Sequence, residues 1–219
     1  MFYRLVLAHL VGDFVLQNRW LVKRKHTPLG LAIHVGLVGL AMLPVTWGQL
    51  DRWWPWLCVI LVVHALTDWG KIRLAPRLGW PPILPFLIDQ LVHLLTLAGV
   101  VVLAQGEMFS LNWSQAEPFW WIASAYLVAT YLVSIALPLW LDPPSLMQRP
   151  LKSRVTLIVI SALVLTLAWR GLPLLIPMVG VALYQAVARH LARNPGTETF
   201  AIEFWSAVVL AACLGWSLS

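Results

Sequence analysis

The stretch LAHLVGDFVLQ, residues 7–17, combines an apolar composition with three polar side chains at intervals of four residues. These are His9, Asp13 and Gln17. Residues four apart lie on one face of an α-helix about a turn from each other, so a helix here would carry a polar stripe. Ionisable groups inside an apolar helix are costly and mark functional sites. The stretch therefore predicts one wall of an intramembrane site.

The composition of the whole chain is that of a polytopic membrane protein. Of its 219 residues, 60% are hydrophobic and 11% are charged, and the mean hydropathy is +0.80. Soluble domains contain about 25% charged residues. The 14 tryptophans include many beside the ends of apolar segments, where an interfacial aromatic belt is expected. Cys58 and Cys213 lie in apolar runs and predict neither a disulfide nor a thiolate metal site.

The net charge of +6 comes from basic residues in short segments between the apolar spans, which is the pattern of membrane topology signals. No basic face is interleaved with exposed aromatic residues, so we expect no nucleic-acid partner. The positive-inside rule places the basic segments in the cytoplasm and both termini outside. Of the fifteen Lys and Arg, twelve lie in the segments 18–28, 71–77, 148–154 and 188–194.

We predict an all-α transmembrane helix bundle with about eight spans. Each apolar segment is close to the roughly 20 residues that cross a bilayer, and only a helix satisfies a lipid-exposed backbone within one segment. Six or seven spans fit if the short segments around RGLP, residues 170–173, are not both spans. Residues 1–105 would form a four-helix unit, and residues 118–219 would add further helices. The predicted spans are 2–18, 28–47, 53–70, 83–104, 118–140, 155–170, 172–189 and 199–218.

Seven His and Asp side chains lie inside the first four spans, all in the cytoplasmic half of the predicted bilayer. Each aspartate among them is four residues from a histidine, so each pair shares a helix face. Helix bundles hold metal ions with carboxylate and imidazole pairs of similar spacing, and this donor set suits Zn, Mn or Fe better than Mg or Ca. We predict a site for one or two divalent ions. The predicted ligands are His9, Asp13, His34, His64, Asp68, Asp89 and His93.

Three further residues, Gln17, Lys71 and Gln90, are predicted to orient these ligands from a second layer. Lys71 follows Asp68 by three residues and also fits an interfacial lysine that extends to the membrane surface. Glu203, in a later span, is a further ligand candidate or an ion-pair partner of Arg189 or Arg193.

Other interpretations of the cluster stay open at this point. A purely structural polar core has to offset about 2.5–3.5 kcal/mol for each carboxylate near the bilayer centre, whereas an interhelical hydrogen bond returns about 0.6 kcal/mol. Two b-type haems could use four of the histidines, although haem ligation requires no aspartate beside them.

The cluster also contains a degenerate repeat. A shift of 55 residues carries His9, Asp13 and His34 onto His64, Asp68 and Asp89. Each repeat would contain two helices, which preserves orientation, so the units would be parallel repeats about an axis along the membrane normal. Two similar half-sites would then face each other.

Four stretches resemble a bacterial integral membrane family known as domain of unknown function 3307. They are LVLAHLVGDFVLQ (5–17), HVGLVGLAML (34–43), VVHALTDWGK (62–71) and FLIDQLVHLL (86–95). The family is distantly similar to membrane proteins labelled metal-dependent hydrolases, and it has no assigned activity. The resemblance implies a multi-pass protein of the bacterial inner membrane. It implicates the residues His9, Asp13, Gln17, His34, His64, Asp68, Lys71, Asp89, Gln90 and His93.

Together these features predict a metal-dependent hydrolase that acts on a membrane lipid, because a bound metal activates water and lipids reach such a site laterally. Asp13 or Asp68 would act as general base. The alternatives are an ion or metal transporter with a proton pathway, which intramembrane Asp and His also form, and an accessory subunit of a membrane complex. Membrane lipids are the expected partners, and a second copy of the chain or another membrane subunit is a further candidate.

The predicted topology is testable by cysteine labelling in a chain without its two native cysteines. A thiol reagent that does not cross the membrane should label a cysteine at Ser110 in intact cells, and it should not label one at Arg24. Labelling at Arg24 alone would invert the topology and move the site to the outer leaflet. The loop expected outside is 105–117, and those expected inside are 19–27, 71–82 and 141–154.

Overall fold

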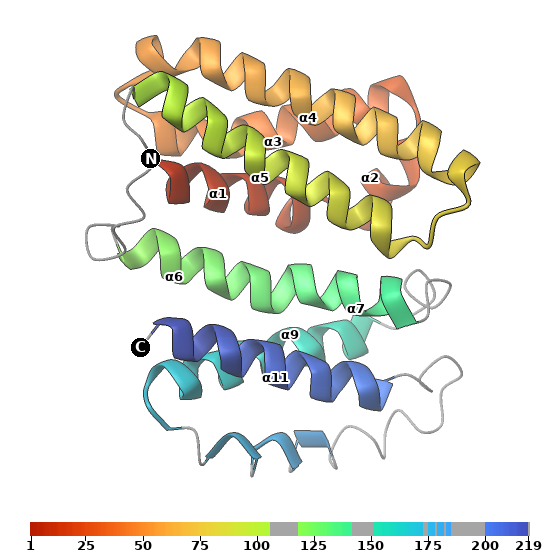
Figure 1. Ribbon diagram of the computed structural model, residues 1–219, viewed down its shortest axis with the longest axis vertical. Helices are drawn as coiled ribbons and strands as arrows, with labels where there is room; N and C mark the ends of the chain where they lie inside the picture. Colours follow the sequence, from red (N-terminus) through yellow and green to blue (C-terminus); the bar gives the residue numbers. More distant parts are fainter. Residues whose placement is uncertain are drawn as a thin grey trace. The chain divides into compact units, whose positions relative to one another are not determined.

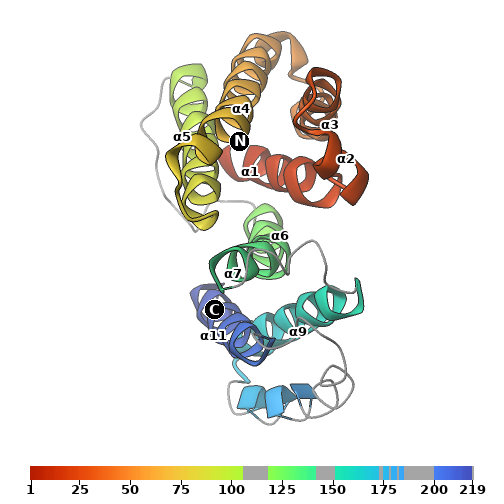
Figure 2. The same ribbon diagram turned by 90° about the vertical axis from the view of Figure 1, so that its right-hand side faces the viewer.

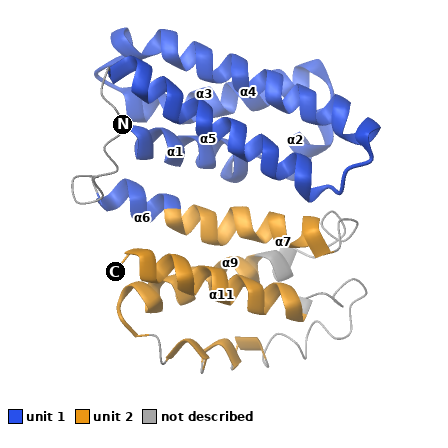
Figure 3. Cartoon of the chain, in the orientation of Figure 1, with its two compact units in different colours: residues 1–124 blue, residues 125–219 orange. Residues whose placement is uncertain are grey.

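The computed structural model confirms the all-α class, since every regular element in the described part of the chain is helical. The chain divides into two compact units, residues 1–124 and 125–219, which are described separately (Figure 3). The predicted boundary between 105 and 118 lies outside the described residues. The described residues are 1–105, 118–141, 151–172, 175–177, 179–181, 183–184 and 200–218.

Unit 1 is built on four long helical segments that form a closed ring. The segment that begins with α1 contacts α3 and α5, and α4 contacts the same two helices. Figure 1 and Figure 2 show α1, α3, α4 and α5 running side by side around a common interior. The elements are α1 (Phe2–Leu10), η1 (Val11–Val15), α2 (Arg19–Arg24), α3 (Pro28–Thr46), α4 (Leu50–Leu78) and α5 (Ile83–Gln105).

Local sequence signals account for the helix ends. The Thr27 hydroxyl accepts a hydrogen bond from the Gly30 amide at the start of α3, and Pro28 occupies the first helical position. Asn18 caps α2 in the same way by accepting from the Leu21 amide. Gly79 ends α4 with φ +64°, a left-handed conformation that glycine adopts without steric cost.

The first predicted span is shorter than expected. The helix passes into a π-turn, η1, in which the Leu16 amide donates to the Val11 carbonyl, and it ends at Val15 instead of residue 18. Gln17 therefore lies beyond the helix and does not continue the stripe of His9 and Asp13. A π-turn adds one residue per turn, so a spacing of four no longer keeps side chains on one face there.

The helix starts follow the predicted repeat. Pro28 begins α3 and Ile83 begins α5, a shift of 55 residues (83 − 28). The halves differ before that point, because α1, η1 and α2 are separate elements where α4 is one continuous helix.

Two regions of different character divide the interior of unit 1. A continuous apolar core fills the region between the first part of α4 and the last part of α5. The polar residues of the first four predicted spans lie in the remaining region of the same interior. The buried core residues are Leu5, Ala8, Val38, Met42, Trp53, Leu57, Ile60, Leu97, Val100 and Val101.

Gly12 sets the distance between the first helix and α3. A Cβ atom at this position would lie 2.7 Å from the Val38 Cα atom, so only glycine permits this approach. Because Asp13 follows directly, the close approach also brings its carboxylate to α3.

Unit 2 is an apolar helical unit with its own core. Its buried residues include Leu165 of α9 and Phe204 of α11, and the Tyr126 hydroxyl lies 2.5 Å from the Thr166 hydroxyl. The elements are α6 (Pro118–Leu127), which crosses the unit boundary, η2 (Val128–Leu132), α7 (Val133–Leu141), α9 (Leu151–Trp169) and α11 (Phe200–Leu218).

Within the described part of the chain, four helical segments are long and apolar enough to cross a membrane. They are Pro28–Thr46, Ile83–Gln105, Pro118–Leu141 and Ala201–Leu218. These segments correspond to four of the predicted spans, and the total number of spans stays a prediction. The predicted span 172–189 and the predicted loops 105–117 and 141–154 fall largely outside the described residues.

Candidate metal centre

The four helical segments of unit 1 bring all seven predicted ligands together in its interior. We call these seven residues the His/Asp cluster. Each side chain is buried, and none of the seven residues is more than 5% exposed. Between them, α1 and η1 contribute His9 and Asp13, α3 contributes His34, α4 contributes His64 and Asp68, and α5 contributes Asp89 and His93.

Four members of the cluster, Asp13, His34, His64 and Asp68, form what we call the central group. The His34 Nε2 atom lies 3.2 Å from Asp13 Oδ1, 3.1 Å from Asp68 Oδ2 and 2.9 Å from His64 Nε2. The His64 Nε2 atom is 3.4 Å from the same Asp68 oxygen. Ligands at 2.0–2.2 Å from a tetrahedral ion are about 3.3–3.6 Å apart, so these distances approach those of a zinc-type site.

Hydrogen bonding cannot satisfy the central group. A ring nitrogen carries at most one hydrogen, so His34 Nε2 can donate to only one of its three neighbours. Whether this nitrogen donates or accepts, its other two contacts are close approaches without a hydrogen bond. A shared cation would turn these contacts into coordination bonds, which is why the arrangement favours a metal site over a purely structural polar core.

Two further ligand groups surround the central one. His9, Asp13 and His93 form one of them, and Asp68, Asp89 and His93 form the other. Within each group the ligand atoms lie within 4.8 Å of one another. Asp13 and Asp68 each belong to the central group and to one outer group, so either carboxylate can bridge two ions. This sharing of carboxylates favours two ions over one.

Several buried atoms of the cluster make no well-formed hydrogen bond to another described residue. They include His9 Nε2, and also His93 Nε2 and Asp89 Oδ1, which lie 3.3 Å apart as a histidine–aspartate pair. Buried polar side-chain atoms nearly always have a partner, and an unpaired one calls for an explanation such as an ion. The three atoms belong to the two outer groups, which places the unused lone pairs where a second ion would bind.

The imidazole rings pack against one another and hold their nitrogens in place. The His64 and His93 rings are stacked with centroids 4.2 Å apart, and the His9 ring meets the His93 ring edge-on at 4.9 Å. The two α4 and α5 histidines are thus fixed by each other as well as by their own helices.

Lys25 is the residue of the centre that sequence analysis missed. It follows α2 and is only 8% exposed. Its ammonium nitrogen lies 2.7 Å from Asp68 Oδ2 and 3.7 Å from Asp13 Oδ1, and it donates to Gln17 Oε1 at 3.0 Å. The sequence places Lys25 in a basic loop segment, and helical periodicity could not find it because the chain reverses between α2 and α3. The sequence offers one signal for such a residue: the predicted spans bury more aspartates than basic side chains, so a further cation from outside the spans is needed.

Lys71 is the second cation of the centre. Its ammonium group lies 3.0 Å from Asp68 Oδ1 and also forms an ion pair and hydrogen bond with Asp89. The interpretation of Lys71 as an interfacial lysine that extends to the membrane surface is therefore wrong. It connects the carboxylates of α4 and α5 instead.

The two predicted glutamines have different surroundings. Gln90 donates hydrogen bonds to Asp13 Oδ2 at 2.9 Å and to Asp89 Oδ2 at 3.3 Å, so it holds two predicted ligands. Gln17 contacts Lys25. Glu203 is fully buried on α11 of unit 2 and is not a member of the ligand groups, while the basic residues predicted as its partners lie outside the described residues.

The charges of the cluster do not balance. With ionised aspartates and protonated lysines, the three carboxylates and two ammonium groups leave a net charge of −1 before the histidines are counted. A buried, uncompensated carboxylate is strongly unfavourable, so one further positive charge is expected here, from a bound cation or from a protonated histidine.

A family model described as protein of unknown function DUF3307 matches residues 1–122. The chain belongs to the DUF3307 family. The DUF3307 match contains the whole His/Asp cluster and both lysines, so the relationship covers the helices that build the centre. No curated protein and no solved structure matches this DUF3307 chain. The resemblance to metal-dependent hydrolases therefore stays a prediction.

Metal content is the first test of the centre. Elemental analysis of purified DUF3307 protein should find one or two divalent ions per chain. Asp68→Asn and His64→Ala should remove most of the metal, because both residues contribute to the central group. Asp51→Asn is a matched control, since Asp51 is an exposed aspartate on the same helix as Asp68. Negligible metal content, or metal content that neither Asp68→Asn nor His64→Ala lowers, would reject the site. A haem absorption band in the purified protein would instead identify a haem protein.

Lys25 provides a second test, because a divalent ion in the central group would compete with its ammonium for Asp68. Lys25→Met should lower the thermal stability of the metal-free protein, since breaking a buried ion pair costs about 3–5 kcal/mol. Added metal should then stabilise this variant more than it stabilises the unmodified protein. Thermal unfolding with and without metal measures both effects. Lys23→Met is the control, because it removes an exposed charge from α2 and should change neither the stability of the metal-free protein nor the stabilisation by metal. Equal stabilisation by metal in the unmodified protein and in both variants would contradict the competition.

Proposed function

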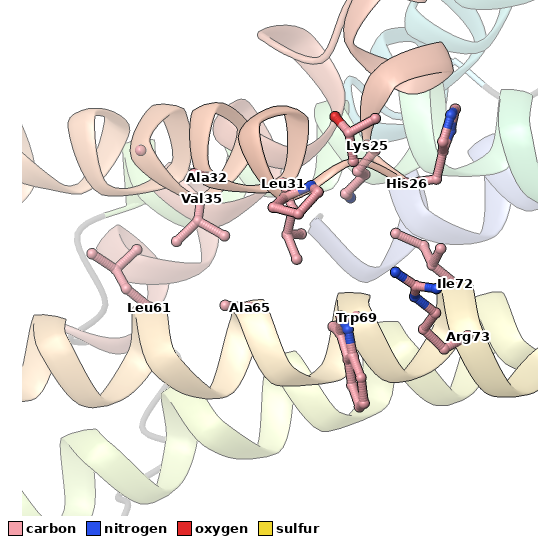
Figure 4. Close-up of a pocket in the computed structure, with 13 residues that line it drawn as sticks. Lys25, His26, Leu31, Ala32, Val35, Leu61, Ala65, Trp69, Ile72 and Arg73 are labelled. Atoms are coloured by element: carbon pink, nitrogen blue, oxygen red, sulfur yellow. The ribbon is translucent and has the colours of Figure 1, made fainter.

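We propose that the protein is a metal-dependent hydrolase that acts on a membrane lipid. The observation that carries the proposal is that Lys25, whose ammonium group contacts Asp68, also lines an apolar groove of about 590 Å³ between α3 and α4 (Figure 4). A hydrolase of this kind needs lateral access for a lipid beside a metal centre, and here one residue, Lys25, contacts both.

A bound metal would act as a Lewis acid and would activate water for attack on an ester or phosphoryl group. The chain itself would supply the general base. Asp13 is the better candidate, because Gln90 orients its Oδ2 atom and only one ammonium group lies near it, at 3.7 Å. Asp68 lies between two ammonium groups at 2.7 and 3.0 Å and serves better as a ligand.

A second recess supports lateral access from another side. It has a volume of about 210 Å³ and lies between α4 and α5, with Lys71 and Asp89 among its lining residues. Both lysines of the centre therefore line apolar recesses in addition to holding carboxylates. The ammonium groups that stabilise the aspartates can also stabilise negative charge on a substrate.

The proposed setting is the cytoplasmic half of a bacterial inner membrane, with both termini in the periplasm. The basic segment that holds Lys25 would then lie at the cytoplasmic surface. Membrane lipids are the proposed partners, and the apolar surface of the helices leaves room for a second copy of the chain or another membrane subunit.

Transport is the main alternative, and the apolar core of unit 1 argues against it. A carrier needs polar groups that continue from the cluster through the protein. The space beside His9, His64 and His93 is closed by Ile60 and Leu97 and leaves about 0 Å³ for a water molecule. The core beyond it consists of apolar side chains, and the hydroxyl of buried Thr46, one turn past Met42, donates back to the Met42 carbonyl of its own helix.

The direct test of the hydrolase is incubation of purified protein with labelled membrane lipids and Zn, Mn or Fe. A metal-dependent product is expected, and Asp13→Asn should reduce its rate by about 10²–10⁴-fold, as for loss of a general base. Asp51→Asn should retain the activity. Absence of any metal-dependent product, together with ion flux in proteoliposomes that Asp68→Asn abolishes, would reject the hydrolase in favour of the transporter.

A further inference from the structure

We infer that the α3–α4 groove binds a lipid with an anionic phosphate headgroup, and that this lipid class is the substrate. That the lipid is the substrate rests on the proposed function, whereas its binding in the groove can be tested without metal or turnover. Three observations support it: the apolar length of the groove, the basic character of one end, and the place of Lys25 between the groove and the His/Asp cluster.

The apolar part of the groove fits a hydrocarbon chain. Figure 4 shows Leu31 and Val35 of α3 facing Leu61 and Ala65 of α4 across the groove. These four side chains are only partly buried in the protein, so an acyl or prenyl chain there would cover apolar surface on both helices. A volume of about 590 Å³ lies within the usual range for sites that hold a small ligand, enough for a headgroup and part of a chain.

The other end of the groove is basic. Lys25, His26 and Arg73 gather at the end where α3 begins (Figure 4). None of the described residues that line the groove is acidic. The N-terminus of α3, capped by Thr27, lies at the same end, and the helix dipole adds positive potential there. A phosphate matches this end in charge, whereas a neutral headgroup would leave Arg73 and His26 without an anion, since Lys25 alone of the three is paired with an aspartate among the described residues.

Lys25 connects the headgroup end to the chemistry. This residue lines the groove, and its ammonium nitrogen lies 2.7 Å from Asp68 Oδ2 in the central group. A phosphate that contacts Lys25 would therefore lie next to the metal ligands. The phosphate ester linkage of the lipid, rather than a bond far along the chain, would be the part of the molecule that reaches the centre.

Electron spin resonance of spin-labelled lipids tests the inference with the full chain in phosphatidylcholine vesicles. Spin-labelled phosphatidic acid should be immobilised by the protein more strongly than spin-labelled phosphatidylcholine. Arg73→Gln should reduce this preference about fivefold, the amount expected for one basic residue near an anionic lipid. Ala65→Trp fills the apolar part of the groove and should reduce the immobilised phosphatidic acid. Free inorganic phosphate should not displace it, since the hydrocarbon chain contributes to binding.

Arg77→Gln is the matched control. Arg77 is an exposed arginine of α4, like Arg73, but it does not line the groove. Its loss should leave the preference unchanged. Equal effects of Arg73→Gln and Arg77→Gln would overturn the inference in favour of a general basic surface, as would Ala65→Trp without effect or displacement by inorganic phosphate.

Metal content and lipid hydrolysis measured on the same preparations separate the two proposals. Lipid preference in the groove without bound metal would reject the hydrolase and leave the groove as an anionic lipid site. Metal-dependent lipid hydrolysis without groove-dependent preference would reject the inference alone. Unchanged metal content in Arg73→Gln and Ala65→Trp would show that both variants are folded.

Discussion

The burial of three carboxylates in an apolar four-helix unit is the constraint on which the rest of the structure depends. Asp68 and Asp89 are at most 1% exposed, and Asp13 is 4% exposed. These buried side chains are shielded from bulk water, so their charges must be compensated by the protein or by a bound cation. Two lysines and four histidines gather around the aspartates from all sides, and the compensation by the lysines is still incomplete by one charge.

The helices are arranged so that this compensation is geometrically available. Gly12 lets the first helix approach α3 closely, which brings Asp13 within 3.2 Å of His34. The π-turn then ends that helix early and lets the chain return through α2, so that Lys25 reaches Asp68 from the side. The remaining interior is closed by an apolar core, which concentrates the polar groups in one region.

Both lysines have two contacts of different kinds. Each forms an ion pair with aspartates of the cluster, and each lines an apolar recess between two helices. A structural counter-ion needs no recess beside it. A side chain that can leave a carboxylate for an anionic ligand, or yield it to a metal, gives a physical link between lipid binding and the metal centre. This link is why we favour the proposed hydrolase over a polar core that only stabilises the bundle.

The sequence by itself determined the helical class, most helix ends and the pairing of histidine with aspartate on α4 and α5. These are local properties: Thr27 and Pro28 start a helix wherever it packs, and a spacing of four puts His64 and Asp68 on one face of any α-helix. Only the tertiary structure decided that Gln17 leaves the stripe, that Lys25 enters the centre and that a groove ends beside it. These features depend on how closely two helices approach and where the chain turns back between them, and both are set by contacts between residues far apart in sequence.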